Sequence, residues 1–133
     1  MRRNILSVVT FFTVVIMLTA CNGKTIKLSA EDNGRTIEMK PGETLLISID
    51  GNPTTGYIWE VDSVDENILG LAGEPDYSTD FKLKSGMTGV GGTYKFTFTA
   101  VSSGTTNLKL KYWRTFEPEN PPVETFQVTV NVK

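Results

Sequence analysis

Strict alternation between apolar and polar residues constrains the fold of this chain more than any other feature. Three runs show it, at residues 93–100, 107–112 and 126–133. In the first run, for example, Phe96 and Phe98 are flanked by lysine and threonine. Successive side chains of a β-strand point to opposite faces of a sheet, so each run predicts a strand with one buried and one solvated face.

Further strands are predicted along most of the chain after residue 24. Looser or weaker alternation is found at residues 25–28, 35–39, 45–49, 57–61 and 76–84. Residues 64–71 show no clear period, and we expect a short helical turn there. No long helical pattern is present in this part of the sequence. About seven short strands with turn residues between them predict an all-β fold, an immunoglobulin-like antiparallel β-sandwich with Trp59 in its core.

The first 20 residues predict a signal peptide that is removed. Arg2 and Arg3 precede an apolar stretch at residues 5–18, which is too short to span a bilayer comfortably. The stretch ends in Leu18-Thr19-Ala20-Cys21, which resembles a bacterial lipobox. We therefore expect Cys21 to carry a lipid and residues 21–133 to form one domain, held on a membrane of the bacterial cell envelope and facing away from the cytoplasm. An ordinary signal peptide with a chance cysteine is the alternative.

Composition excludes several classes of function. Removing Arg2 and Arg3 with the signal peptide leaves 11 basic and 15 acidic residues, a net charge of −4. This charge argues against nucleic-acid binding, because a protein needs a basic face to bind the phosphate backbone. The chain has no histidine and a single cysteine, so nucleophilic and metal chemistry lack their usual residues. We expect no enzymatic activity, no cofactor, no metal and no nucleic-acid partner, and a monomeric domain.

Three unusual loops are predicted to lie at one end of the sandwich. Because successive antiparallel strands reverse direction, every second connection lies at the same end. The connections at residues 51–56, 85–92 and 114–122 are related in this way. Variable loops on a rigid sandwich are a common way to build a binding surface.

The first of these loops contains Asn52, Pro53, Thr54, Thr55 and Gly56. Proline restricts its own backbone and that of the preceding asparagine, and glycine allows a sharp bend. A loop of this kind is narrow, stiff and uncharged, and it could enter a cleft at little entropic cost. Alternatively, it is a turn that caps its own backbone through the Asn and Thr side chains.

The other two loops also have two interpretations each. The second has glycine at 86, 89, 91 and 92, and it either offers bare backbone to a partner or is a floppy hairpin. The third contains Arg114 and Phe116 and follows Trp113, a composition typical of interface hot spots. Alternatively, Trp113 and Phe116 fold back onto the end of the sandwich.

Three motifs, in this order, resemble the chagasin family of cysteine-peptidase inhibitors, whose members carry NPTTG, GxGG and RPW motifs on an immunoglobulin-like sandwich. The corresponding segments are Asn52-Pro53-Thr54-Thr55-Gly56, Gly89-Val90-Gly91-Gly92 and Arg114-Thr115-Phe116. The first two are complete, whereas the third has Thr115 and Phe116 in place of Pro and Trp. The resemblance covers essentially all of residues 21–133.

The resemblance implies a reversible, non-covalent inhibitor of papain-like cysteine peptidases. Thr54 and Thr55 would approach the catalytic cysteine and histidine, while the glycine-rich segment would lie on one side of the cleft. Arg114 and Phe116 would hold the other side, with Trp113 as a further contact. From the residues alone, a surface adhesin or glycan-binding envelope lipoprotein is the alternative, because exposed aromatic rings also stack on sugars. A structural envelope lipoprotein is a third possibility.

Overall fold

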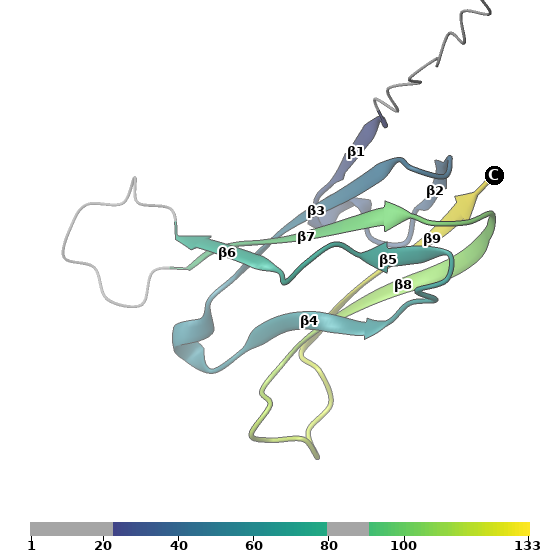
Figure 1. Cartoon of the computed structure of the whole chain (residues 1–133). Helices are drawn as coiled ribbons and strands as arrows, with labels where there is room; N and C mark the ends of the chain where they lie inside the picture. Colours follow the sequence, from purple (N-terminus) through teal and green to yellow (C-terminus); the bar gives the residue numbers. More distant parts are fainter. Residues whose placement is uncertain (1–22, 80–90) are drawn as a thin grey trace, which may run out of the picture.

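The computed structural model describes residues 23–79 and 91–133, and these contain nine strands and two short 3-10 helices (Figure 1). The strands are β1 (Thr25–Leu28), β2 (Thr36–Met39), β3 (Thr44–Gly51), β4 (Ile58–Ser63), β5 (Leu69–Leu71), β6 (Asp76–Thr79), β7 (Gly92–Ala100), β8 (Gly104–Trp113) and β9 (Glu124–Val132). The 3-10 helices are η1 (Ala30–Asp32) and η2 (Pro53–Thr55). The predicted signal peptide, Cys21 and Gly89 lie outside the described residues.

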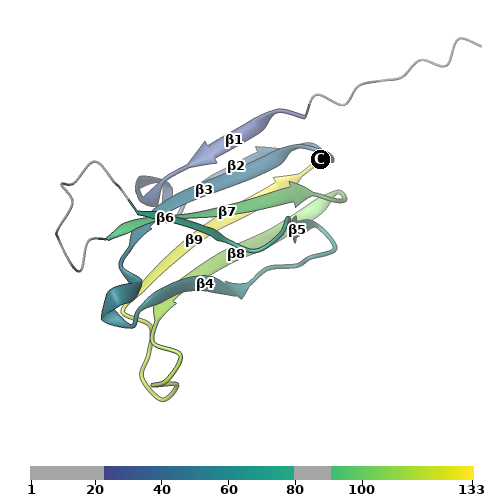
Figure 2. The same cartoon turned by 60° about the vertical axis from the view of Figure 1, so that its left-hand side comes forward.

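The strands form two sheets that stack as a sandwich (Figure 2). One sheet has the order β1-β3-β7-β5, and β6 also pairs with β7. The other has the order β2-β9-β8-β4. The predicted all-β, immunoglobulin-like sandwich is confirmed.

The core lies between the sheets and consists of the apolar halves of the alternating runs. Phe96, Phe98 and Phe126 are each at most 1% exposed, and Trp59 is 3% exposed. Burying a side chain of this size contributes roughly 1.5–3 kcal/mol to stability. Among the described residues, the buried hydrophobic side chains fall between Leu28 and Val132 and form one cluster.

Two local features differ from the sequence prediction. Residues 66–68 form a turn, but Leu69–Leu71 is strand β5 paired with β7, so the expected helical turn is wrong there. A three-residue strand is too short to display a period of two. In addition, β1 pairs with β3 and β2 pairs with β9 in parallel, whereas the pairs among β3, β4, β7, β8 and β9 are antiparallel as expected.

The β3–β4 and β8–β9 loops lie at one end of the sandwich, and residues 23 and 133 lie at the other (Figures 1 and 2). At the loop end, β3 and β7 bring Gly51 opposite Gly92, and β4 and β8 bring Ile58 opposite Trp113. At the far end, Gly23 lies against the β2–β3 turn at Gly42, and Val132 pairs with Gly104. Within the described ranges, no helix is both long enough and apolar enough to cross a membrane.

Candidate functional site

The segment from Asn52 to Gly56, which we call the NPTTG turn, is a single turn of 3-10 helix held by its own hydrogen bonds. The Asn52 carboxamide oxygen accepts from the Thr54 backbone N–H at 3.2 Å and from the Thr54 hydroxyl at 2.6 Å. The Thr55 hydroxyl donates to the Asn52 carbonyl at 2.6 Å, and the turn ends at Gly56 with φ +84°. Positive φ is the reason for glycine at this position.

The self-capping alternative is therefore right about the local structure of the turn. Yet the capping leaves Thr54 and Thr55 exposed. Both hydroxyl protons are used inside the turn, so the exposed side presents methyl groups and hydroxyl lone pairs. The turn is thus preorganised, and the capped structure and a role as a rigid wedge are compatible.

Strands β4 and β8 anchor the base of the NPTTG turn. The Trp59 indole N–H donates to the Asp50 carbonyl at 2.9 Å, and the Asn52 backbone N–H donates to the Tyr112 hydroxyl at 2.9 Å. The Tyr112 ring lies 5.0 Å from that of Trp59 and 5.4 Å from that of Tyr57, measured between centroids. The buried side of the turn therefore rests on a fixed aromatic layer.

Gly51, just before the turn, leaves room for this aromatic layer. A Cβ atom at Gly51 would lie 2.8 Å from the Tyr94 ring and 3.0 Å from the Trp59 ring. Burial raises the pKa of the Tyr94 phenol, with smaller contributions from Tyr112 and Tyr77, so it stays protonated at neutral pH.

Arg114 joins the β8–β9 loop to the NPTTG turn. Its Nη2 donates to the Thr55 carbonyl at 3.1 Å, and its guanidinium carbon lies 4.3 Å from the centroid of the Tyr57 ring. Glu117 adds an ion pair at 3.5 Å. The Phe116 ring lies beside Gly56, where an added Cβ would come within 3.0 Å of it, yet Phe116 is 66% exposed.

Trp113 is placed differently from its neighbours. Tyr112 contributes to the aromatic layer under the turn, so the next residue on the strand faces outward. There the Lys111 ammonium lies 3.9 Å from the centroid of the Trp113 ring, and the indole N–H is buried without a hydrogen-bond partner. Trp113 is thus partly covered on the outer face of the sheet, whereas Phe116 stands exposed beside the turn.

Gly91 and Gly92 are the described part of the glycine-rich segment. A Cβ at Gly91 would lie 3.3 Å from the Gly51 carbonyl oxygen, and one at Gly92 would collide with the Ser78 carbonyl. The backbone at these glycines therefore passes close to the base of the NPTTG turn. The remainder of the predicted loop, including Gly89, is outside the described residues.

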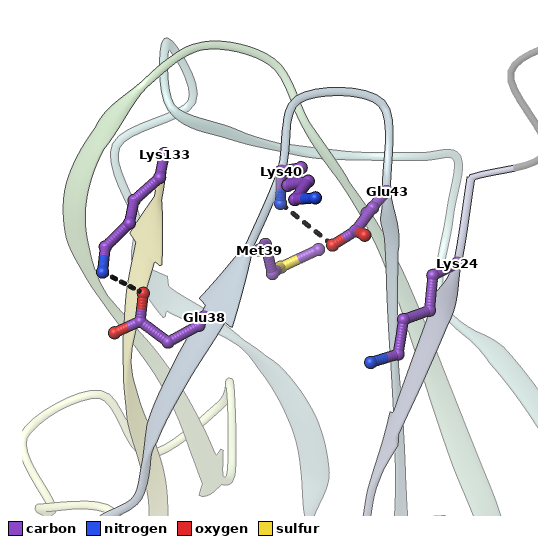
Figure 3. A pocket seen from close by; sticks show the side chains of 6 residues that line it. All are labelled: Lys24, Glu38, Met39, Lys40, Glu43 and Lys133. Atoms are coloured by element: carbon purple, nitrogen blue, oxygen red, sulfur yellow. Dashed lines mark hydrogen bonds and ion pairs between the residues drawn. The ribbon is translucent and has the colours of Figure 1, made fainter.

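A larger hollow lies at the far end of the sandwich (Figure 3). Its volume is about 460 Å³, compared with about 270 Å³ for a smaller one beside Arg114 and Tyr57. It is lined by Lys24, Glu38, Met39, Lys40, Glu43 and Lys133. Lys133 pairs with Glu38 at 3.1 Å, and the Glu43 carboxylate accepts from the Lys40 backbone N–H at 2.9 Å. This hollow is open, and both of its acidic side chains are already engaged within the chain.

Among the described residues, no group of three or more acidic side chains, histidines or cysteines is arranged to hold a metal ion. Sequence reasoning did not anticipate the roles of Tyr57 and Tyr112. The available signal was a tyrosine at the loop end of an apolar strand face, since a buried Tyr hydroxyl usually finds a hydrogen-bond partner.

Comparison with known proteins decides the family. Residues 38–130 match the model of the chagasin family of peptidase inhibitors, I42. The chain belongs to the chagasin family of cysteine-peptidase inhibitors. Membership also means that its relatives are inhibitors and not enzymes.

Two curated relatives extend over most of this chagasin-family chain. Amoebiasin-1 of Entamoeba histolytica is 36% identical over 108 residues, which cover 81% of this chain and all of the relative. Chagasin of Trypanosoma cruzi is 31% identical over 107 residues, which cover 77% of this chain and 93% of the relative.

Solved structures of chagasin-like inhibitors share the fold. The crystal structure of the cysteine protease inhibitor EhICP2 from Entamoeba histolytica matches with a TM-score of 0.75 at 21% identity, covering 84% of this chain and 98% of the other. PbICP-C, solved in complex with falcipain-2, matches with a TM-score of 0.60 at 18% identity, covering 84% of this chain and all of the other.

Proposed function

We propose that this chagasin-family inhibitor acts reversibly and without covalent chemistry on papain-like cysteine peptidases, by placing the NPTTG turn in the active-site cleft. The glycine-rich segment at Gly91 and Gly92 would lie on one side of the cleft. Arg114 and Phe116 would lie on the other. Membership in an inhibitor family and the falcipain-2 complex of a protein with the same fold support this proposal.

The observation that carries the proposal is the bracing of the NPTTG turn. A turn that is already capped by Asn52 and held by Tyr112 and Arg114 loses little conformational entropy on docking. A standard interface of about 1,600 Å² can then give tight binding. Thr54 and Thr55 are exposed at the tip, where they can obstruct a nucleophile sterically.

The partial third motif would alter affinity or target choice. A phenyl ring at Phe116 keeps an aromatic face but lacks the indole N–H donor of the family's Trp. Trp113 does not supply the missing donor, because the Trp113 indole N–H is buried and Lys111 covers the Trp113 ring. We therefore assign the exposed anchor of this loop to Phe116.

The test is inhibition by residues 22–133, which contain the whole described core. We expect competitive inhibition of at least one enzyme in a small panel of papain-like peptidases and none of a serine peptidase. Because the obstruction is steric, the domain should also bind a peptidase whose catalytic cysteine is changed to alanine. Absence of inhibition across the panel at micromolar concentrations of folded protein would rule the proposal out.

We also propose that Cys21 carries a lipid that holds the protein on a membrane of the cell envelope, outside the cytoplasm. The support is the sequence Leu18-Thr19-Ala20-Cys21 after a short apolar segment. Several acyl chains anchor a domain stably where a single one is marginal. Cys21→Ser should move the protein out of the detergent-dependent membrane fraction. A variant that remains there to the same extent would contradict the lipid anchor.

A further inference from the structure

The NPTTG turn poses a problem that follows from the proposed function. Exposed loop tips made of small polar residues are preferred sites of proteolytic cleavage. Thr54 and Thr55 form such a tip, and the proposal brings them next to a peptidase nucleophile. The turn must therefore occupy the cleft without becoming a substrate.

Cleavage requires a carbonyl carbon within about 3–3.5 Å of the nucleophile and a carbonyl oxygen that can accept from the oxyanion hole. In this turn the Asn52 carbonyl accepts from the Thr55 N–H at 3.2 Å, and the Pro53 carbonyl accepts from the Gly56 N–H at 3.0 Å. The Thr55 carbonyl accepts from Arg114 at 3.1 Å. Extending the chain into a cleavable form would break these bonds together.

Two of the contacts that hold this shape come from Tyr112, near the end of strand β8, and from Arg114, just after it. The Tyr112 hydroxyl accepts a hydrogen bond from the Asn52 backbone N–H at 2.9 Å, and the Tyr112 ring packs against Trp59. The Arg114 guanidinium donates a hydrogen bond to the Thr55 carbonyl and lies over the Tyr57 ring. One contact lies at each end of the turn, so the two residues fix both ends to the sandwich.

We propose that Tyr112 and Arg114 are positioning residues that keep the NPTTG turn too tightly folded to be cleaved by the peptidase that it obstructs. Without them, the turn loses these two contacts with the sandwich and opens more often. In the open form, the peptidase thiolate adds to a carbonyl carbon, and the C–N bond breaks as the imidazolium gives its proton to the leaving amine. Water then hydrolyses the thioester and restores the enzyme, leaving a chain nicked within residues 52–56.

The experiment uses papain as the probe and the variants Tyr112→Phe, Arg114→Gln and their combination. The matched control is Thr106→Val. Thr106 is also on β8 and is buried, and its hydroxyl accepts the Asp65 backbone N–H at 2.9 Å at the far end of the sandwich. The control thus removes a comparable hydroxyl acceptor away from the turn. Inhibition progress curves and intact mass are followed for the same samples.

We expect the unmodified domain and Thr106→Val to stay intact and to inhibit steadily. Each single variant should be cut within residues 52–56 about tenfold faster, the effect of losing one hydrogen bond of roughly 1.4 kcal/mol, and the double variant faster still. Inhibition should fade as two fragments accumulate, whose masses add up to that of the intact domain plus one water. The proposal is overturned if the double variant stays intact, whether or not it still inhibits, or if Thr106→Val is cut as fast as Tyr112→Phe.

A separate measurement distinguishes this proposal from the proposed function. If the unmodified domain inhibits no papain-like peptidase, the proposed function is wrong. Amide hydrogen exchange can still measure whether Tyr112 and Arg114 keep the turn closed. Faster exchange at Thr55 and Gly56 in the double variant than in Thr106→Val supports the positioning roles. Equal exchange in the two proteins overturns them.

Discussion

The NPTTG turn and the β8–β9 loop, residues 114–123, lie side by side but are built on different principles. The turn is polar, its hydroxyls are bonded internally, and proline and glycine set its backbone. The β8–β9 loop carries two of the three exposed large hydrophobic side chains among the described residues, Phe116 at 66% and Val123 at 55%. The turn therefore supplies shape, and the β8–β9 loop supplies apolar contact area.

Under the proposed function, this division separates the blocking of a cleft from the holding of the peptidase within one end of the sandwich. Apolar area drives association, whereas a rigid polar turn contributes mainly by avoiding an entropic cost. The two loops are joined by Arg114 and by the contact of Phe116 with Gly56. Substitutions on either side, or at the contact, should therefore have distinct signatures.

The largest effect should come from enlarging the tip of the turn. Thr55→Trp places a large ring at the exposed tip, where it should clash with a narrow cleft and weaken inhibition by several kcal/mol, on the order of a hot-spot loss. Inhibition constants and melting temperature are measured together. Val101→Trp, at an exposed position at the far end, is the control and should leave inhibition unchanged. An inhibitor that accepts Trp at 55 would argue against entry of this turn into the cleft.

Removing apolar contact should have the next largest effect. Phe116→Ala should weaken inhibition by about 2 kcal/mol, as expected for a lost aromatic anchor, with little change in melting temperature because the ring is exposed. Phe116→Trp should keep or improve affinity. Val101→Ala serves as the matched exposed control. Equal inhibition by Phe116→Ala and the unmodified domain would remove this loop from the interface.

A smaller effect should come from the contact between the two loops. Gly56→Ala forces a side chain into φ +84° and brings a methyl group to 3.0 Å from the Phe116 ring. Stability should fall by about 1–2 kcal/mol from the backbone alone. Gly34→Ala is the control, since its φ is +85° with nothing within 4 Å of an added Cβ, so it should lose similar stability and keep inhibition.

A double-mutant cycle of Gly56→Ala with Phe116→Ala then measures the coupling. Residues in contact typically couple by about 0.5–3 kcal/mol, whereas independent ones add. Strict additivity of the two changes in inhibition would mean that the turn and the β8–β9 loop act as separate units.

The smallest effect concerns acid stability, which should not involve either loop. Hydrogen bonds from the Ser29 backbone and Arg35 lower the pKa of Asp32, and Asn131 with Lys133 lowers the pKa of Glu38. Because both pKa values are depressed in the folded state, their stabilising contribution is present at neutral pH. It is lost as pH falls from about 5 toward 2.

Glu38→Gln should therefore flatten the dependence of melting temperature on pH in this acid range. Glu74→Gln, at an exposed loop position, is the control. The same acid slope in Glu38→Gln and in the unmodified domain would contradict the assignment. Inhibition by the folded domain should not follow the titration of Glu38, which lies at the far end.

The sequence predicted the long strands well because a one-sided sheet imposes period two on them. Strands β7, β8 and β9 coincide closely with the alternating runs, and their apolar residues are the core. Strand β5 was missed because three residues, Leu69–Leu71, cannot display a period. The parallel pairing of β1 with β3 was also not predictable, since alternation indicates a face but not a partner.

The candidate site was predictable in composition but not in its connections. Pro53 and Gly56 indicated a stiff turn, and the structure has Gly56 at positive φ. The bond from Asn52 to Tyr112 joins residues 60 apart in sequence and depends on the register of β4 against β8. Register follows from the packing of the whole sandwich, so local patterns do not reveal it.

The opposite placement of the loops and of the two ends of the described chain has a practical consequence for using this domain as a reagent. Gly23 lies against the β2–β3 turn, and Lys133 pairs with Glu38 at one side of the hollow of Figure 3. A fluorescent protein, a bead or a second inhibitor joined at either end would therefore emerge away from the NPTTG turn. The domain can be immobilised or fused in tandem by both ends with its loop end open to solution, and a short flexible linker would then give a second copy a millimolar effective concentration.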